Sequence, residues 1–223
     1  KTMINLKKIK NFIFDCDGVL YDDLEGVFGQ VSKRMTQYIS KKLHLNLEKA
    51  KELQTNYFHK YNTSLNGLMI HHDINPQEFL KYVHDINLDF LKKDVILRKE
   101  LLKLKSKKFI FTNGSHEHVS NITKTLGIND LFDNVFDITD GNFVPKPSIE
   151  PYEKLIKKFD IDPLETVFIE DIAINLEPAK KLGMKTIWLK NNEYWGKKHS
   201  DKKFIDLKIK NLSSFLKEID ILN

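Results

Sequence analysis

The sequence predicts an α/β fold, in which a mostly parallel sheet of five strands carries an all-helical segment inserted after the first strand. The main observation is that short apolar runs alternate with helical patterns from about residue 99 onward, which is typical of a parallel sheet. Residues 22–98, by contrast, show only helical spacing of apolar side chains. A chain of 223 residues with 41% apolar content is sufficient for one large domain, or for a core with a smaller satellite.

The first predicted strand is the apolar run from Phe12 to Phe14, which is too short for a helix and suits a central buried strand. Because side chains alternate along an extended segment, Asp15 and Asp17 should leave the strand tip on one side, while Cys16 points into the core. Ligands bind beyond the carboxyl ends of strands in open α/β sheets, so this placement predicts a site. A solvated turn at Gly18, or a calcium loop, is the alternative at this point.

The inserted segment is predicted to contain three helices, at residues 27–43, 47–58 and 76–83. Pro76 suits the first turn of the third helix. A loop is expected over residues 63–73, and a helix over 95–104 should return the chain to the sheet.

The remaining elements follow in alternation. Strands are expected at 109–111, 135–138, 167–169 and 186–189, and helices at 118–126, 150–159, 174–182 and 212–219. Gly183 should end the helix before the fifth strand, and the lysine-rich segment 197–203 is interpreted as an exposed loop. We therefore expect a core of residues 1–20 and 99–223 and a helical cap of residues 21–98.

The charge of the chain permits several kinds of partner. A formal net charge of +5 is compatible with nucleic acid, a membrane surface or a small phosphorylated compound. The lysines are scattered along the chain, which favours a solvated surface over a nucleic-acid patch. Cys16 is the only cysteine, so no disulfide within the chain is possible, and no segment has the length and apolarity of a membrane span. We expect a cytoplasmic protein without nucleic-acid or membrane partners.

Polar side chains follow three of the predicted strands, and a lysine lies between the last two groups. These residues are Asp15, Asp17, Thr112, Asn113, Gly114, Lys146, Glu170 and Asp171. Four carboxylates suit Mg²⁺, which would offset the repulsion between a carboxylate and a phosphate. The ammonium of Lys146 adds positive charge, and the Thr112 hydroxyl and nearby amides can donate to phosphate oxygens. The pattern predicts phosphoryl transfer with Asp15 as nucleophile and Asp17 as general acid and base.

These residues fall into four motifs, which are Asp15-x-Asp17-Gly18-Val19, Phe111-Thr112-Asn113-Gly114, Lys146-Pro147 and Glu170-Asp171. The motifs and their order resemble those of the haloacid dehalogenase superfamily, and the resemblance covers almost the whole chain. It implies a Rossmann-like core, magnesium, an aspartyl-phosphate intermediate on Asp15 and a movable cap. It also implies that the backbone carbonyl of Asp17 meets the metal, that Asp171 is a metal ligand, and that Thr112 and Lys146 bind phosphate. Glu170 would reach the metal directly or through water. Dehalogenases lack the second acid of the first motif, so Asp17 favours a phosphatase, with a phosphomutase as an alternative.

Tyr21 and an aromatic-rich stretch of the insert resemble the pyrimidine 5'-nucleotidase subgroup of that superfamily. The resemblance implies a nucleoside monophosphate substrate such as UMP or CMP, with Tyr57 and Tyr61 stacking on the base and Asn66 reading its edge. Packing in the core is the alternative for the two tyrosines. His118, just after the phosphate-binding turn, is a further candidate for substrate contact.

The leading hypothesis from the sequence is thus a magnesium-dependent pyrimidine 5'-nucleotidase. A phosphatase acting on phosphoglycolate or on sugar phosphates is the first alternative. A noncatalytic nucleic-acid-binding protein, suggested only by the basic charge, is the last.

Overall fold

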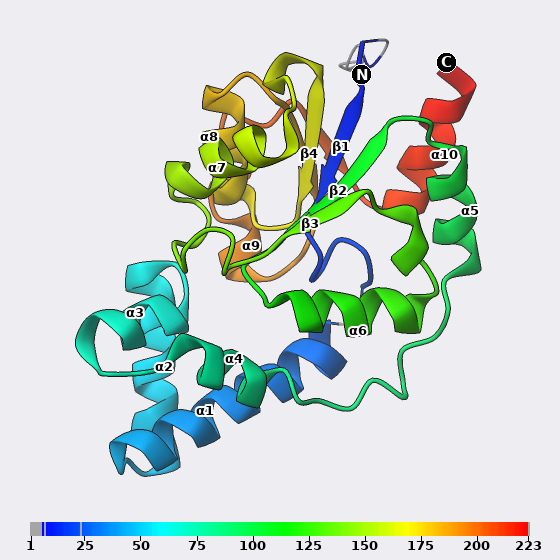
Figure 1. Ribbon diagram of the computed structural model, residues 1–223. Coiled ribbons are helices and arrows are strands. Elements are labelled where there is room, and N and C mark those ends of the chain that lie inside the picture. Colours follow the sequence, from blue (N-terminus) through cyan, green and yellow to red (C-terminus); the bar gives the residue numbers. More distant parts are fainter. Residues whose placement is uncertain (1–5, 7, 23, 223) are drawn as a thin grey trace.

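The computed structural model describes residues 6, 8–22 and 24–222, and a parallel sheet lies at its centre (Figure 1). The strands are β1 (Asn11–Phe14), β2 (Lys107–Phe111), β3 (Asn134–Phe136), β4 (Thr166–Glu170), β5 (Lys185–Leu189) and β6 (Leu207–Ile209). They are arranged in the order β3-β2-β1-β4-β5-β6, and every neighbouring pair is parallel. The predicted α/β fold is confirmed. The sheet has one more strand than expected, because β6 is too short to show an alternating pattern.

The order of the strands reverses at β1, which explains where a site can form. From β1 the chain moves outward through β2 and β3, then crosses to β4 on the other side of β1. The crossover helices of the two halves therefore leave in opposite directions, and the strand ends between them are open. Ligands bind at such switch points in doubly wound folds.

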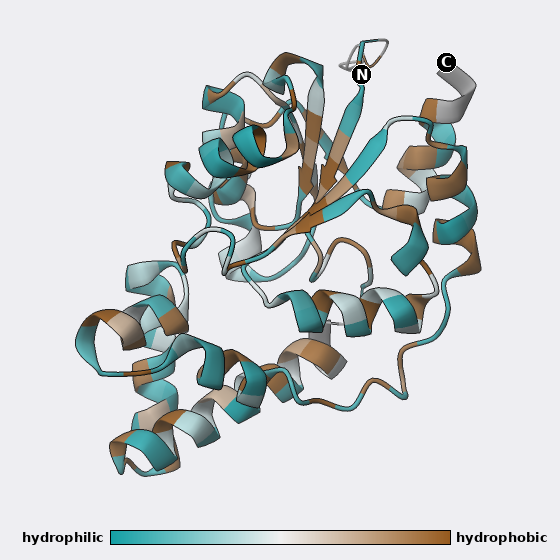
Figure 2. Cartoon of the chain, viewed as in Figure 1, coloured by the Kyte–Doolittle hydropathy of each residue, from teal (hydrophilic) through white to brown (hydrophobic). Residues whose placement is uncertain are grey.

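Helices cover both faces of the sheet (Figure 1). One face packs against α5 (Val95–Lys103), α6 (His116–Leu126) and α10 (Leu212–Leu222), and the other against α7 (Ile149–Phe159) and α8 (Leu176–Lys181). The alternation of β1 determines this division, since Phe12 and Phe14 belong to the first hydrophobic cluster and Ile13 to the second. Hydrophobic residues are concentrated in the central strands (Figure 2). Short helical turns complete the core: η2 (Asn129–Leu131), η3 (Pro163–Glu165), η4 (Ala173–Asn175) and α9 (Tyr194–Lys197).

The insert consists of a π-helical turn and four helices that pack on one another away from the sheet (Figure 1). These are η1 (Leu24–Phe28), α1 (Gly29–Leu43), α2 (Leu47–Tyr61), α3 (Ser64–His71) and α4 (Pro76–Val83). Pro76 stands at the first position of α4, as predicted. The loop predicted over residues 63–73 was wrong, because most of it forms α3. The Thr63 hydroxyl caps α3 by accepting from the amide of Asn66 at 3.1 Å, and Leu65 and Leu68 are buried beneath it.

Three other sequence predictions concern the lysine-rich segment, the division into core and cap, and membrane spans. The segment 197–203, predicted to be an exposed loop, begins at the end of α9 and is otherwise made of turns. The division into a core of residues 1–20 and 99–223 and a cap of residues 21–98 stays a prediction, and residues 1–5, 7, 23 and 223 of it lie outside the described part. Within that part, none of the helices is both long and apolar enough to cross a membrane.

Candidate active site

The end of β1 delivers the first acids. Asp15 continues the ladder to β4, since its amide donates to the carbonyl of Ile169 at 3.0 Å, and its side chain is 10% exposed. Gly18 has a φ of 80°, which turns the chain away after Asp17. Cys16 is fully buried within the hydrophobic core, as predicted.

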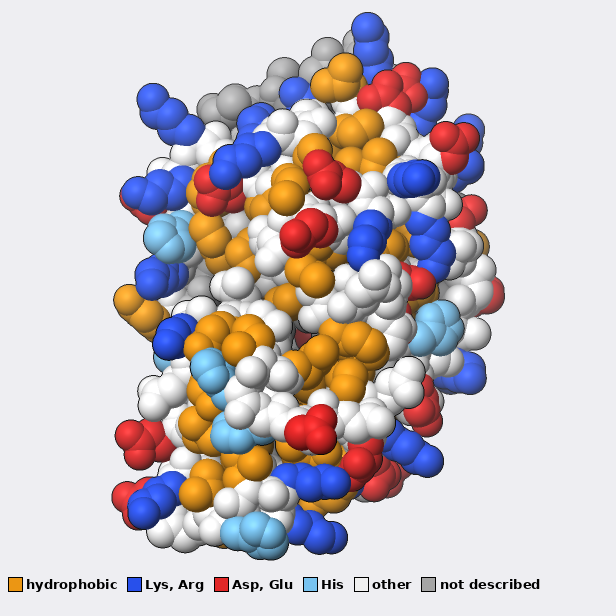
Figure 3. Space-filling model, turned by 60° about the vertical axis from the view of Figure 1, so that its left-hand side comes forward, with side chains coloured by type: hydrophobic (Ala, Val, Ile, Leu, Met, Phe, Trp, Pro, Cys, Tyr) orange, Lys and Arg blue, Asp and Glu red, His pale blue; other side chains and the backbone are white. Residues whose placement is uncertain are grey.

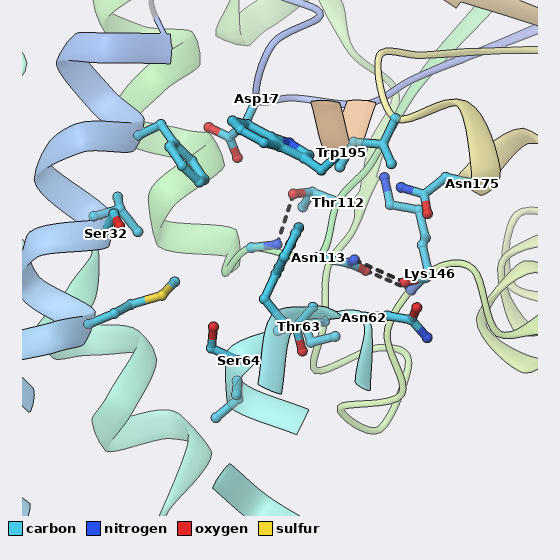
Figure 4. Close-up of a pocket in the computed structure, with 18 of the residues that line it drawn as sticks. Asp17, Ser32, Asn62, Thr63, Ser64, Thr112, Asn113, Lys146, Asn175 and Trp195 are labelled. Atoms are coloured by element: carbon cyan, nitrogen blue, oxygen red, sulfur yellow. Dashed lines mark hydrogen bonds between the residues drawn. The ribbon is translucent and has the colours of Figure 1, made fainter. Parts of the chain in front are cut away.

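Lys146 joins the ends of three strands. Its Nζ donates to Asp15 Oδ1 at 2.9 Å, to Glu170 Oε2 at 2.8 Å and to the carbonyl of Phe111 at 2.9 Å. Burial disfavours the ammonium, but the charges of Asp15 and Glu170 outweigh this cost and raise the pKa of Lys146 above its usual range. Asn113 holds the lysine's backbone, because its Oδ1 accepts from the Lys146 amide at 2.8 Å (Figure 4). Lys146 is therefore a fixed positive charge beside the predicted nucleophile.

Glu170 serves as an anchor for the acidic loop after β4. Its Oε1 accepts from the amides of Asp171 and Ile172, both at 3.1 Å, and its Oε2 accepts from Lys146 and from Asn175 Nδ2 at 3.2 Å. Both carboxylate oxygens are thus engaged, and the side chain is fully buried. Burial raises the pKa of Glu170, but Lys146 and these donors lower it by a larger amount, so the group is held as a carboxylate.

Asp171 is held differently. Asn191 Nδ2 donates to its Oδ2 at 2.9 Å, but its buried Oδ1 has no hydrogen-bond partner among the described residues. Burial raises the pKa of Asp171 well above its usual range, and the negative charges of Glu170 and Asp15 add to this shift. Burial and Glu170 likewise raise the pKa of Asp15, against the opposing effect of Lys146. The ammonium of Lys146 therefore offsets only part of the effects that oppose ionisation of Asp15.

A metal ion fits this arrangement. Asp15, Glu170 and Asp171 each offer a carboxylate oxygen, and the three oxygens lie within 4.8 Å of one another. The unpartnered Oδ1 of Asp171 is an available hard ligand, and buried carboxylates with open positions suit a divalent cation such as Mg²⁺. The donor set therefore agrees with the metal that the sequence motifs imply.

Two side chains hold Asp17, one from the loop after β1 and one from α6. Tyr21 donates its hydroxyl to Asp17 Oδ1, and His118 of α6 donates from Nε2 to the same oxygen at 2.8 Å. Burial raises the pKa of Asp17, but the charge and hydrogen bond of His118 and the Tyr21 hydroxyl lower it well below its usual range. Conversely, burial opposes a charge on His118 while Asp17 raises its pKa. The two side chains therefore form an ion pair that holds a proton on the histidine.

A second histidine comes from the insert. The His84 ring stacks on His118, with a centroid distance of 4.3 Å and an angle of 17° between the planes. Its Nδ1 shares a hydrogen bond of 2.9 Å with the hydroxyl of Ser115. Burial lowers the pKa of His84 to about 3, and the positive charge of His118 contributes, so His84 is neutral. The end of α4 is thus attached to the start of α6.

The turn that is predicted to bind phosphate follows β2. The Gly114 amide donates to Thr112 Oγ1 at 2.9 Å (Figure 4), and Ser115 caps α6 by accepting from the His118 amide at 3.2 Å. A side chain at Gly114 would approach Thr112 Oγ1 to 3.3 Å, so glycine leaves room beside this hydroxyl. Helix N-termini and amides of this kind bind phosphate oxygens.

A cavity of about 500 Å³ opens from these strand ends toward the insert. Hydrophobic side chains gather around the hollow between the two parts, while basic and acidic side chains are interspersed elsewhere on the same face (Figure 3). The predicted site residues that line the cavity are Asp15, Asp17, Tyr21, Thr112, Asn113, Gly114, His118, Lys146 and Asp171. The structure thus brings together residues that are more than 150 positions apart in the sequence.

Three predicted substrate contacts are not on the cavity wall. Tyr57 packs over Gly67 and donates to or accepts from His72 Nε2 at 3.0 Å, so its ring fills the α2–α3 interface. Tyr61 shares a hydrogen bond with His71, and Asn66 donates to the carbonyl of Tyr61 at 3.0 Å. Helical spacing does not distinguish the face that packs on α3 from the face that lines the cavity, and the structure places these residues in the packing.

The insert instead lines the cavity with residues that sequence reasoning did not single out. Phe28 of η1 stacks on Trp195 of α9, with ring centroids 5.5 Å apart. Ser32 of α1 and Gln54 of α2 form a polar part of the wall. Asn191, which holds Asp171, was also missed. No motif marks these residues, because each is brought to the cavity or to Asp171 only by the packing of the insert or of the segment after β5.

Comparison with known proteins agrees with this geometry. A family model described as haloacid dehalogenase-like hydrolase matches residues 9–183. Glyceraldehyde 3-phosphate phosphatase of Pyrococcus furiosus is 25% identical over 230 residues, covering 96% of this chain and 95% of that protein. Phosphate metabolism protein 8 of Saccharomyces cerevisiae is 28% identical over 191 residues, which cover 78% of this chain but only 60% of the yeast protein. The crystal structure of a HAD phosphatase from Thermococcus onnurineus shares the fold, with a TM-score of 0.63, 20% identity and coverage of 95% of this chain and 98% of that one.

Proposed function

The chain belongs to the haloacid dehalogenase-like hydrolase family and is a phosphoric monoester hydrolase, and we propose that it is a magnesium-dependent phosphatase that prefers sugar phosphates. The observation that carries the proposal is the arrangement around Lys146. Its ammonium bridges Asp15 and Glu170, and the open Oδ1 of Asp171 lies in the same group of carboxylates. A phosphate group entering this pocket would meet both a nucleophile and compensating positive charge.

In the first half of the proposed reaction, Asp15 attacks the phosphorus atom of the substrate. Lys146 engages Oδ1, so we assign the attack to Oδ2. A bond forms between Oδ2 and phosphorus while the bond from phosphorus to the ester oxygen breaks. Asp17 is ionised in its ion pair with His118, so it relays the proton of the histidine to the departing oxygen, which leaves as the alcohol.

In the second half, a water molecule attacks the phosphorus of the aspartyl phosphate. Asp17 takes a proton from this water, the bond from phosphorus to Asp15 breaks, and inorganic phosphate and the free carboxylate result. The ion pair of Asp17 with His118 supports this assignment, because it holds one proton next to the acid that must give and take it. The Thr112 hydroxyl, whose oxygen accepts from the Gly114 amide and whose hydrogen can therefore point away from it, is assigned to a phosphate oxygen.

Asp15, Asp171 and the backbone carbonyl of Asp17 would hold Mg²⁺, with Glu170 reaching it directly or through water. The ion supplies positive charge that offsets the repulsion between the phosphate and the carboxylates. The unpartnered Asp171 oxygen and the raised pKa values of Asp15 and Asp171 support this role.

The preference for sugar phosphates rests on the relatives and on the wall of the cavity. The relative from Pyrococcus furiosus that matches nearly the whole chain is named for a sugar phosphate. Tyr57, Tyr61 and Asn66, on which the nucleotide hypothesis rested, lie in the packing between α2 and α3. A pyrimidine nucleoside monophosphate is the second candidate, because the stacked rings of Phe28 and Trp195 provide an aromatic surface for a base.

Phosphate release from a panel of substrates tests the proposal. The panel contains glyceraldehyde 3-phosphate, ribitol 5-phosphate, phosphoglycolate, UMP and CMP, each assayed with and without Mg²⁺. We expect release to require Mg²⁺ and kcat/KM to be highest for a sugar phosphate. A higher kcat/KM for UMP or CMP would instead support the nucleotidase assignment.

Two controls complete this test. Asp15→Asn should abolish turnover with the fold retained, whereas Asp22→Asn, at an exposed position outside the cavity, should not. Formation of an isomer in place of free phosphate would identify a mutase. Binding of DNA or RNA together with inert chemistry in Mg²⁺ would favour the noncatalytic alternative. A cytoplasmic location stays a prediction.

A further inference from the structure

The wall of the cavity formed by the insert contains a polar group that the proposed reaction does not use. Ser32 of α1 lies across the cavity from Lys146, on the side of the insert (Figure 4). Around it are Lys51 and Gln54 of α2, which also line the cavity. We call these three residues the Ser32 subsite.

The hydrogen bonds of the Ser32 subsite leave one polar function open. Lys51 Nζ donates to Ser32 Oγ at 2.7 Å, and Gln54 Nε2 donates to the same oxygen at 3.1 Å. A serine hydroxyl has two acceptor lone pairs and one donor hydrogen. Both lone pairs are used, so Ser32 can only donate, and the structure shows no acceptor for it among the described residues. The subsite is therefore built to meet an oxygen that accepts.

Gln54 makes this orientation rigid. Its side chain is 6% exposed, and its Oε1 accepts from the Thr36 hydroxyl at 2.6 Å. The Thr36 hydroxyl oxygen lies closer to Gln54 Oε1, at 2.6 Å, than to the carbonyl of Ser32, at 3.1 Å, so its single hydrogen points to Gln54 and the NH₂ end of the amide faces Ser32. Lys51 can only donate to the hydroxyl oxygen of Ser32, which leaves the serine hydroxyl as a donor. A buried and fully hydrogen-bonded amide of this kind holds its neighbours in one arrangement.

The charges along the cavity determine which accepting oxygen fits best. The acids on its wall, Asp15, Asp17 and Asp171, all belong to the strand ends of the phosphate site. The insert side contributes Lys51, whose ammonium contacts Ser32 and has no carboxylate partner among the described residues. A negatively charged oxygen is therefore favoured over a neutral one at this end of the cavity.

We propose that the Ser32 subsite binds the far end of the substrate, and that it prefers, among sugar phosphates and related esters long enough to reach it, those whose far end presents a carboxylate or another strongly accepting oxygen. The inference rests on the proposed phosphatase function, since it concerns the other end of the same cavity. It requires Ser32 to donate its hydrogen and Lys51 to contribute charge. Under this proposal, esters that end in an alkyl group are not preferred substrates.

A matched set of esters tests the subsite. An alkyl phosphate, the hydroxyalkyl phosphate and the phosphorylated carboxylate of the same chain length are compared, over a series of increasing lengths. At the best length, we expect kcat/KM to be highest for the carboxylate and lowest for the alkyl ester. A hydrogen bond to a charged group corresponds to a preference of about tenfold or more.

The variants separate the subsite from the rest of the cavity. Ser32→Ala and Lys51→Met should each reduce the preference for the carboxylate over the alkyl ester by about tenfold. Lys49→Met, on the same helix but outside the cavity, should leave the preference unchanged. A preference that stays the same in Ser32→Ala and Lys51→Met would overturn the proposal.

A binding measurement distinguishes failure of the subsite from failure of the proposed function. The phosphonates that correspond to the three esters cannot be hydrolysed and are titrated by calorimetry. The same order of affinity, lost in Ser32→Ala, supports the subsite even if no ester is turned over. Absence of turnover for every ester would refute the phosphatase function alone, whereas equal affinity for the three phosphonates would refute the subsite.

Discussion

At the scale of single residues, the proposed proton transfer depends on the surroundings of Asp17. Tyr21 and His118 both donate to its Oδ1, and His84 stacks on His118 from the insert. The acid is therefore ionised and paired with a protonated histidine. In this pair His118 holds the proton, and Asp17 is the carboxylate that accepts a hydrogen bond from it.

His118→Asn tests whether the proton on the histidine is used. Asparagine can still donate to Asp17 but has no proton to give, so we expect kcat to fall by about tenfold or more. Asp17 raises the pKa of His118, so the kcat of the wild type should fall as the pH rises above that pKa. This decrease in kcat at high pH should disappear in His118→Asn, while Lys124→Ala on the exposed side of α6 should retain it. The same decrease in His118→Asn as in the wild type would contradict a role of His118 as the source of the proton.

His84 predicts a dependence of stability on pH. Burial lowers its pKa in the folded protein to about 3, against about 6.5 in an unfolded chain. Between these values the unfolded state binds a proton that the folded state does not. The stability due to neutral His84 is therefore fully present above about pH 6.5 and is lost as the pH falls toward 3.

His84→Phe provides the measurement. Phenylalanine retains a ring to stack on His118 but cannot bind a proton, so the variant should lose less stability than the wild type on acidification. Urea unfolding of both proteins at neutral pH and near pH 5 gives the two losses. Equal losses would show that His84 does not titrate in this way.

At the scale of secondary structure elements, the insert depends on close contact between α2 and α3. Gly67 of α3 lies against Tyr57 of α2, and an added Cβ would come within 2.4 Å of the Tyr57 ring and 2.5 Å of its Cβ. The Cβ of Tyr57 is attached directly to the backbone, so side-chain rotation cannot relieve this contact. The glycine therefore determines how closely α2 and α3 approach each other. The position of these helices in turn sets the position of the part of the cavity wall that they form.

Gly67→Ala should destabilise the protein by about 1–3 kcal/mol, because overpacking exceeds the gain in helix propensity. Gly29→Ala is the matched control, since nothing lies within 4 Å of its added Cβ at the start of α1. We expect that variant to be as stable as the wild type or up to about 1 kcal/mol more stable. Thermal or urea unfolding of both variants checks the difference, and a Gly67→Ala protein as stable as Gly29→Ala would contradict the packing argument.

At the scale of the whole molecule, the active site is a concentration of negative charge at the switch point of the sheet. Asp15 and Glu170 contact the buried ammonium of Lys146, and Asp171 lies in the same group of carboxylates with no ion pair among the described residues. The raised pKa values of Asp15 and Asp171 show that burial and mutual repulsion oppose their ionisation. A bound divalent cation would relieve this repulsion and so stabilise the folded chain.

Magnesium should therefore raise the thermal midpoint of unfolding. At a Mg²⁺ concentration of 100 times its Kd, the expected stabilisation is about 2.7 kcal/mol. Asp171→Asn removes one ligand and one buried charge, so it should be more stable than the wild type without the ion and gain less from it. Sodium chloride of equal ionic strength is the control, and an equal gain in wild type and Asp171→Asn would contradict the site.

The predictable part of the fold and site consists of local patterns. Apolar runs such as that from Phe12 to Phe14 indicate buried strands because their length and composition suit no other element. The α3 helix was missed because a short segment of eight residues that starts with Ser64 resembles a loop. The β6 strand was missed because three residues show no periodicity.

By itself, the sequence determined the parallel α/β fold and the residues at the strand ends, because strand polarity places every such residue at one edge of the sheet. Only the tertiary structure decided which oxygens remain open, as with Asp171, and which faces of the insert helices line the cavity. Tyr57 and Ser32 show the difference: the sequence analysis proposed Tyr57 as a substrate contact and did not single out Ser32, but the packing of α2 on α3 and α1 places only Ser32 at the cavity. The physical reason is that spacing along a chain specifies a face of one helix, whereas the partner of that face is set by contacts between elements far apart in sequence.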